Sequence, residues 1–225
     1  MTTTSTPART TATATHPGEI RRYKDGTRMN HWFVALLFFA AALSGLALFH
    51  PVLFFFSNLF GGGQLTRILH PFLGLAMVLG FVFLFFTVWR ENLIGRADRE
   101  WLRHSGQMLK GNKGSMPAVG KYNAGQKLVF WGFAVSLLLL LVTGFMFWAP
   151  YFFHLFPVTV RRLAILVHAV SAVVLVLSVI VHVYAAIWVK GTTRAMTRGT
   201  VTDSWARHNH PLWHREMTEG HPPRD

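Results

Sequence analysis

Residues 161–190 read RRLAILVHAVSAVVLVLSVIVHVYAAIWVK, an almost unbroken apolar run between basic ends. The run is longer than the ~20 residues that an α-helix needs to cross a bilayer. It contains two histidines, His168 and His182, which are 14 residues apart. On an α-helix these side chains point within ~40° of each other and lie ~21 Å apart along the axis. We therefore predict two imidazoles on one face of the helix at two membrane depths. Because an ionisable residue inside a span indicates a functional site, both histidines are candidate functional residues.

Three further apolar runs in the 225-residue chain are long enough to span a membrane. We therefore predict an all-α fold, an integral membrane four-helix bundle that occupies residues 21–190. Residues 1–20, rich in Thr, Ala and Pro, are expected to be a disordered tail, and residues 191–225 a partly helical polar tail. The four spans are expected at about residues 31–56, 67–89, 128–148 and 161–189.

The positive charges are distributed unequally between the two ends of this bundle. The net charge is +13, and of the 22 Lys and Arg residues only Arg67, Arg161 and Arg162 lie at one end. Since Lys and Arg keep short loops cytoplasmic, both termini are predicted to be cytoplasmic. Nucleic-acid binding is excluded as a function, because no separate basic domain exists to provide it.

The chain has no cysteine. Disulfides, thiolate metal sites, iron–sulfur ligation and covalent c-type haem attachment are therefore excluded within it. A haem in this protein would have to be held non-covalently, by His or Met.

Four of the twelve histidines are expected inside or at the ends of the spans. His31 and His182 lie toward the cytoplasmic side, and His70 and His168 toward the outside. We therefore predict two pairs, His31/His182 and His70/His168, which share the span at residues 161–189. The remaining histidines are expected to be solvated or to lie near the outer ends of the spans: His16, His50, His104, His154, His208, His210, His214 and His221.

Pairs of imidazoles on facing helices suit bis-histidine ligation of haem iron, which leaves no open position and favours one-electron transfer. Each histidine alone could instead cap a helix or bond a carbonyl. A proton relay is disfavoured because the apolar parts of the spans contain no Asp or Glu. Zinc is disfavoured because it usually takes three or four convergent ligands.

A porphyrin needs small residues where its flat face meets a helix, and the spans supply several. Close helix packing is the alternative role for each of them. The candidates are Ser44-Gly45, Gly74, Gly80 and Thr143-Gly144.

Four sequence motifs carry a resemblance to a known family. They are Asn30-His31-Trp32, the stretch RILHPF at residues 67–72, the stretch GKYNAGQK at 120–127, and Trp188-Val189-Lys190-Gly191. Together they resemble the cytochrome b (gamma) subunit of membrane-bound formate dehydrogenase, over roughly residues 20–218. Cytochrome b subunits of nickel–iron hydrogenases share the histidine pattern more loosely.

The resemblance implies a multi-pass anchor in the bacterial inner membrane that holds two haem b groups. Its axial ligands would be His31, His70, His168 and His182. Its partners would be an iron–sulfur (beta) subunit and a molybdenum or tungsten catalytic (alpha) subunit. The chain would not itself oxidise formate, but would pass electrons to quinone at the cytoplasmic side.

The same resemblance places the quinone at Asn123, Gly125, Gln126 and the neighbourhood of His182. The two amides are uncharged hydrogen-bond donors for a quinone carbonyl, and Gly125 allows close backbone approach. The alternative is a helix start, with Asn123 as N-cap and Gln126 completing a capping box. Both roles can coexist in one turn.

Two other functions stay open at this point. One is the cytochrome b subunit of a hydrogenase or related oxidoreductase. The other is a haem-free membrane anchor or transporter subunit.

Overall fold

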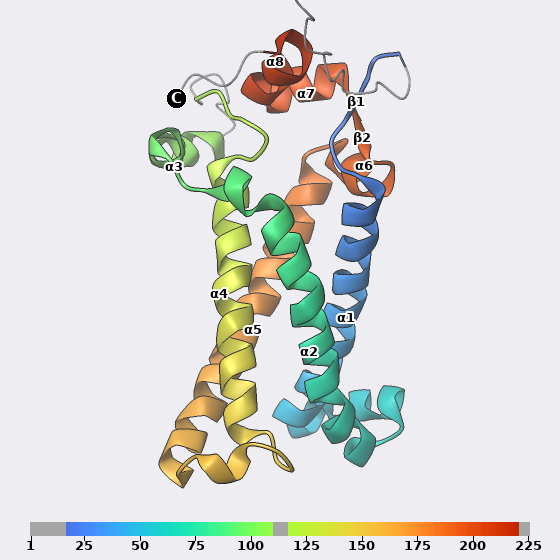
Figure 1. Ribbon diagram of the computed structural model, residues 1–225, viewed down its shortest axis with the longest axis vertical. Helices are drawn as coiled ribbons and strands as arrows, with labels where there is room; N and C mark the ends of the chain where they lie inside the picture. The colour runs from blue at the N-terminus through green and yellow to red at the C-terminus, as the bar shows by residue number, and fades with distance from the viewer. Residues whose placement is uncertain (1–16, 110–116, 221–225) are drawn as a thin grey trace, which may run out of the picture.

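The computed structural model describes residues 17–109 and 117–220 of the chain. Its body is a bundle of four long helices (Figure 1), each long and apolar enough to cross a membrane. The predicted all-α membrane bundle is confirmed. The helices are α1 (Asp25–Phe49), α2 (Gly63–Val88), α4 (Ala124–Phe147) and α5 (Val158–Trp188).

The helix bounds differ from the predicted spans in a consistent way. Each long helix begins earlier than its predicted span. The spans were predicted from the apolar runs, whereas residues before a run, such as Asp25, are also helical. The first span was predicted to reach residue 56, but α1 ends at Phe49. Pro51 has no N–H to continue an α-helix and instead opens a 3-10 helix, η1 (Pro51–Phe60). Short 3-10 helices also follow α2 and precede α5, namely η2 (Trp89–Asn92) and η4 (Phe153–Leu155).

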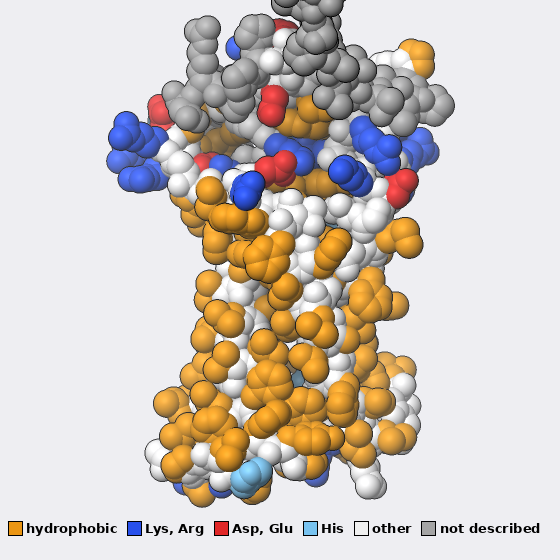
Figure 2. All heavy atoms as spheres, in the orientation of Figure 1, with side chains coloured by type: hydrophobic (Ala, Val, Ile, Leu, Met, Phe, Trp, Pro, Cys, Tyr) orange, Lys and Arg blue, Asp and Glu red, His pale blue; other side chains and the backbone are white. Residues whose placement is uncertain are grey.

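The bundle has a small buried core at mid-height. It is formed by five residues, at least one from every long helix: Ala41, Met77, Val78, Leu137 and Leu175. Leu175 lies midway along α5 between His168 and His182. The bundle is therefore filled by apolar side chains between the two histidine levels, while its outer surface remains apolar (Figure 2).

A compact terminal cap closes one end of the bundle. It consists of β1 (Glu19–Arg21), α6 (Thr192–Thr197), β2 (Thr200–Thr202), α7 (Asp203–Asn209) and α8 (Pro211–Glu219). β1 and β2 pair antiparallel, with Ile20 opposite Val201. The cap has its own buried core, with the indoles of Trp205 and Trp213 at its centre.

The cap changes the interpretation of both tails. The expectation of disorder for residues 1–20 is wrong for 17–20, because β1 gains hydrogen bonds and packing from the other end of the chain; residues 1–16 lie outside the described residues. The segment from 191 to 219 is more than a partly helical polar tail, since it encloses a core of its own.

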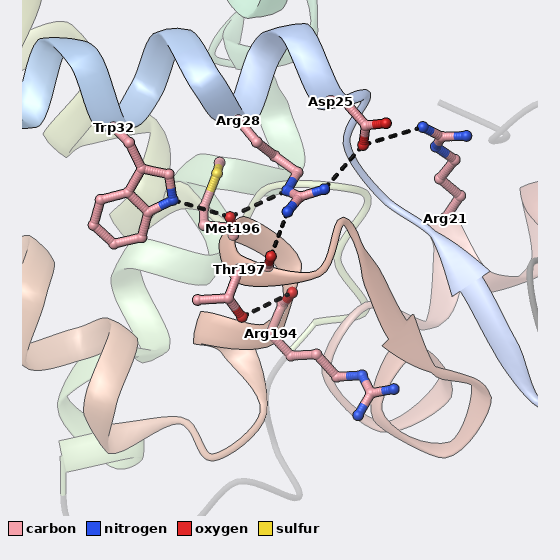
Figure 3. A network of polar contacts seen from close by, with 7 residues as sticks. All are labelled: Arg21, Asp25, Arg28, Trp32, Arg194, Met196 and Thr197. Carbon is pink, nitrogen blue, oxygen red and sulfur yellow. Dashed lines mark hydrogen bonds and ion pairs between the residues drawn. The ribbon is translucent and has the colours of Figure 1, made fainter.

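Polar contacts join the start of α1 to α6 (Figure 3). The Arg28 guanidinium donates to the carbonyls of Met196 and Thr197 and pairs with Asp25 at 2.9 Å. The Trp32 indole donates to the same Met196 carbonyl at 3.1 Å. These donors satisfy carbonyls at the end of a helix that lack a partner within it. Because α6 follows α5 directly, these contacts also bring the first turns of α1 to the end of α5.

Most of the charged side chains visible in Figure 2 gather at the cap end of the molecule. Both ends of the described chain lie there, in β1 and α8 (Figure 1). Within the cap, the buried Arg22 guanidinium donates to the Lys121 carbonyl and lies 4.8 Å from the centre of the Trp213 ring. Arg22 therefore fixes the segment that precedes α4 against the cap.

His210 was predicted to be solvated, and this is wrong. Its side chain is only 3% exposed, and Nδ1 donates to the Gly120 carbonyl at 2.7 Å. Burial and the nearby Arg22 guanidinium lower the pKa of His210 to about 4, although the bond to Gly120 acts in the opposite direction. The imidazole is therefore neutral near pH 7 and joins the junction of α7 and α8 to the segment before α4. His16 and His221 lie outside the described residues.

The His210 pKa predicts that the cap loosens in mild acid. Between about pH 6.5 and 4 the unfolded segment binds a proton that the folded cap excludes, so stability falls as the pH is lowered through this window. The full loss is up to about 3 kcal/mol. Hydrogen exchange of the amides of residues 200–213 at several pH values measures it. His210→Gln keeps an N–H donor without titrating and should flatten the dependence, whereas His208→Gln, at an exposed position, should not. Equal pH dependence in wild type and His210→Gln would contradict this account.

Candidate functional site

The structure brings the four candidate histidines together in two pairs. The ring centres of His31 and His182 are 6.3 Å apart, and those of His70 and His168 are 6.4 Å apart. Within each pair the rings come from different helices, and α5 contributes one ring to each. These are the pairs predicted from the depth of each histidine in its span.

His31 and His70 lie farther inside their helices than expected. His31 was predicted to open its span, but α1 begins at Asp25. His70 was predicted in the first turn of its span, but α2 begins at Gly63. Polar residues before each apolar run are helical, so neither histidine lies in the first turn of its helix.

Hydroxyl groups hold the pair that lies farther from the terminal cap. Ser44 Oγ is 2.9 Å from Nδ1 of His70, and Thr143 Oγ1 is 3.0 Å from Nδ1 of His168. Both hydroxyl residues are buried. Each imidazole therefore has its Nδ1 engaged by a neighbouring helix and keeps Nε2 for another partner.

The small residues picked from the sequence serve different purposes. A Cβ on Gly45 would lie 3.0 Å from Cε1 of His70, and one on Gly144 would lie 3.4 Å from Cε1 of His168. Both glycines therefore give room to an imidazole ring. Gly80 instead lets α2 approach α1, since a Cβ there would meet Val34 at 2.7 Å. At Gly74 nothing lies within 4 Å of the Cβ position.

Zinc has no suitable ligand set in the part of the chain that the structure describes. No group of three or more His, Asp or Glu side chains converges there. Each imidazole pair offers two nitrogen ligands, and zinc sites in proteins usually have three or four protein ligands.

The turn before α4 has the capping box expected as one of its two roles. Asn123 Oδ1 accepts from the Gln126 amide at 2.9 Å, and Gln126 Oε1 accepts from the Asn123 amide at 3.0 Å. These bonds satisfy two of the amide donors left free at a helix start. Because both bonds use the amide oxygens, the NH₂ groups of the two side chains are not consumed by the cap.

A cavity of about 600 Å³ lies beside this turn, between α3 (Arg96–Leu109), the segment at 118–122 and α8. Asn123, Gly125 and Gln126 are not among its lining residues. The indole of Trp101 lines it and lies 3.5 Å from the Cβ position of Gly125. The residues on either side of the turn, Tyr122 and Lys127, line the cavity directly, and Trp101 lies between it and Gly125.

Ion pairs hold α3 and the turn at the bundle end. Lys127 Nζ lies 2.8 Å from Asp98 Oδ2, and Lys121 Nζ lies 2.8 Å from Glu91 Oε1. Burial is the main cause that raises the pKa of Tyr122 well above 10, so its hydroxyl, which meets the Tyr23 hydroxyl at 3.1 Å, stays protonated. Polar side chains from η2, from α3 and from the segment before α1 thus contact the GKYNAGQK stretch.

A family model described as prokaryotic cytochrome b561 matches residues 22–199. The chain belongs to the prokaryotic cytochrome b561 family. The match covers all four long helices, both imidazole pairs and the turn at Asn123. Membership of a cytochrome b family implies haem b.

Cytochrome b556 subunits of formate dehydrogenase are similar to this chain along most of its length. The cytochrome b556(fdo) subunit of Escherichia coli K12 is 43% identical over 88% of this chain and 93% of its own length. The nitrate-inducible cytochrome b556(Fdn) subunit of the same strain is 41% identical over 88% and 91%. The cytochrome b556 subunit of Haemophilus influenzae is 39% identical over 88% and 83%. The resemblance to formate dehydrogenase cytochrome b subunits is thereby confirmed.

The imidazole pairs fit a haem iron by distance. Two imidazoles on opposite sides of one metal, each with a bond of about 2 Å and about 1.1 Å from nitrogen to ring centre, place their centres about 6 Å apart. The observed 6.3 and 6.4 Å agree with that geometry. Nδ1 of His31 is buried and has no hydrogen-bond partner among the described residues.

Sequence reasoning missed the hydroxyl partners of the imidazoles. From the sequence, Ser44 and Thr143 were predicted only to provide small side chains beside glycines, for contact with a porphyrin or for helix packing. The available signal was their position: each directly precedes a glycine in the first helix of a hairpin whose second helix carries a histidine.

The capping box predicts different effects for two substitutions at Asn123. Asn123→Ala should cost about 1 kcal/mol, because the Gln126 amide loses its acceptor. Asn123→Ser should cost much less, because a serine hydroxyl accepts the same bond. Hydrogen exchange at the Gln126 amide measures both variants. Equal exchange in the two would mean that the side-chain cap does not stabilise the start of α4.

Proposed function

We propose that this chain is the di-haem b subunit of a formate dehydrogenase complex in the bacterial inner membrane, which carries electrons across the membrane to quinone. The observation that carries the proposal is that one four-helix bundle contains two imidazole pairs. In each pair the distance between the rings suits ligation of one iron. The identity to formate dehydrogenase cytochrome b556 subunits favours formate as the electron source.

In this proposal His31, His70, His168 and His182 would hold the haem iron through their imidazole nitrogens. A haem with both axial positions filled supplies one-electron transfer without binding oxygen or substrate. The protein contributes the spacing of the two levels: α5 fixes His168 and His182 ~21 Å apart along its axis. The apolar core around Leu175 fills the bundle between the levels.

The charge distribution supports an orientation of the chain in the membrane, on which the proposed direction of transfer rests. With the Lys- and Arg-rich cap end in the cytoplasm, the His70/His168 pair lies toward the outside and the His31/His182 pair toward the cytoplasm. Electrons then enter at the outer pair from an iron–sulfur subunit. Moving one electron inward against a potential negative inside costs about 2.3 kcal/mol per 100 mV.

The quinone site is proposed at Asn123, Gly125, Gln126 and the neighbourhood of His182. The NH₂ groups of the two amides are left as donors by the capping box and would bond the quinone carbonyl. The nearby cavity, lined by Glu91, Asp98 and Lys127 among others, offers polar side chains for the protons that quinone reduction consumes.

The proposed partners are an iron–sulfur (beta) subunit and a molybdenum or tungsten catalytic (alpha) subunit, with membrane lipid around the apolar surface of the bundle. The chain itself would not oxidise formate. Purification of the chain together with its partner subunits would distinguish a formate dehydrogenase anchor from a hydrogenase anchor, because the copurifying catalytic subunit differs.

The proposal predicts two b-type haems per chain, one of which depends on His168. A dithionite-reduced minus oxidised spectrum, with a pyridine haemochrome count, should show two haems in wild-type membranes. His168→Ala should reduce the count to one, because only His70 remains on that level. His154→Ala, at an exposed position near the same bundle end, should keep both.

Two haems per chain in His168→Ala would contradict the assignment of this ligand. A wild-type spectrum without a b-type α-band would favour a haem-free anchor or transporter subunit instead.

The quinone site predicts that Asn123→Ser separates capping from quinone binding. Serine keeps the cap but lacks the NH₂ donor, so quinone reduction should fall about tenfold, as expected for the loss of one hydrogen bond of about 1.4 kcal/mol. Haem content and exchange of the Gln126 amide should stay as in wild type. A wild-type rate of quinone reduction in Asn123→Ser would place the quinone elsewhere.

A further inference from the structure

The two helical hairpins of the bundle contain the same three-residue arrangement. In the α1–α2 hairpin, Ser44-Gly45 faces the His70 ring. In the α4–α5 hairpin, Thr143-Gly144 faces the His168 ring. A hydroxyl residue and the glycine after it thus hold one imidazole from the neighbouring helix, twice, at the same level of the bundle.

The hydroxyl protons in both arrangements are committed to the helix backbone. Ser44 Oγ donates to the Ala41 carbonyl at 3.0 Å, and Thr143 Oγ1 donates to the Leu139 carbonyl at 2.6 Å. This is the usual bond of a Ser or Thr side chain within a helix. Because a hydroxyl has one proton, its contact with the histidine must be an accepted bond. Nδ1 of His70 and of His168 therefore carries the ring proton, and Nε2 carries a lone pair.

The glycines fix the position of the same rings. The Cβ positions of Gly45 and Gly144 lie 3.0 and 3.4 Å from Cε1, the carbon between the two ring nitrogens. A larger residue would push the imidazole away from the hydroxyl. Each hydroxyl–glycine unit thus sets both the tautomer and the distance of its ring from the helix.

The other imidazole pair has no equivalent support within the described residues. Nδ1 of His31 is buried and unpartnered there, and the contacts of its ring are with Trp32 and His182. The His182 ring meets the edge of Phe133 with centres 5.7 Å apart. The two pairs are therefore chemically unequal, although their ring separations are almost the same.

We infer that Ser44 and Thr143 are positioning residues that lower the reduction potential at the His70/His168 level relative to the His31/His182 level. The inference rests on the proposed di-haem function. An imidazole whose other N–H is hydrogen-bonded is a stronger donor to its metal. A stronger donor stabilises oxidised iron, which lowers the potential. Electrons that enter at the outer level would then move toward a level of higher potential.

The test is a potentiometric titration of the haem α-bands in the purified complex. Thr143→Val removes the hydroxyl at nearly constant shape. Thr87→Val is the matched control, because Thr87 also donates to a helix carbonyl, that of Phe83 at 2.8 Å, but on an exposed face. Ser44→Ala and the conservative Thr143→Ser complete the set.

In Thr143→Val we expect one haem to become easier to reduce, with the reduced-to-oxidised ratio at a fixed potential rising about tenfold, as for other outer-shell partners. That change corresponds to about 59 mV for a one-electron couple. The second haem should keep its potential. Ser44→Ala should shift the same haem, and Thr143→Ser should keep the wild-type value.

Three outcomes would overturn the inference: a shift in Thr143→Val no larger than in Thr87→Val, an equal shift of both haems, or the same shift in Thr143→Ser. If Thr143→Val loses the haem, retention of it in Thr143→Ser supports the hydroxyl role, and its loss there overturns it. A wild-type complex without two b-type haems would contradict the proposed function itself, whereas two haems with unshifted potentials would contradict only this inference.

Discussion

The rest of this structure depends on the close approach of imidazole rings from different helices inside an apolar bundle. A neutral imidazole buried among apolar side chains needs a polar partner, because leaving its nitrogens unpaired costs free energy. His70 and His168 meet that need with hydroxyls from neighbouring helices and lie 6.4 Å apart. All four long helices take part in these contacts. α5 carries one ring of each pair, and α1 and α2 carry the opposite rings. The hydroxyls come from α1 and α4.

The terminal cap helps to place the other imidazole pair, His31 and His182. His31 and His182 lie on α1 and α5, which are joined beyond the bundle by the contacts of Arg28 and Trp32 with α6. Arg28 and Trp32 donate to a carbonyl near the end of α6. In a longer helix, an amide of the same helix would donate to that carbonyl. The cap therefore aligns the start of α1 with the end of α5, and His31 follows Arg28 by less than one turn of the helix. A part of the chain that was predicted to be polar tails thus helps to place the His31/His182 pair.

Much of this arrangement follows from the sequence, and the remainder has definite physical reasons for being missed. Apolar length predicts the four helices, and helical rise predicts which histidines share a level, because both depend only on regular geometry. The antiparallel pairing of Ile20 with Val201 is long-range, and strands of three residues carry no readable pattern. His210 gives no sign of burial, since its neighbours Asn209 and Pro211 are polar or turn-forming. Ser44 and Thr143 look like helix-packing residues until the facing ring is known.

The hydroxyl–glycine units also explain why one bundle can hold two levels that differ in chemistry. Both pairs use the same type of side chain at nearly the same separation, so the rings alone would make the two levels equivalent. A single helix such as α5 cannot break that equivalence, because it offers each histidine the same backbone. The facing helices supply a difference, because α1 and α4 each place a hydroxyl against an imidazole of the His70/His168 pair. In the proposed di-haem arrangement, these two oxygen atoms would lower the reduction potential at the His70/His168 level only.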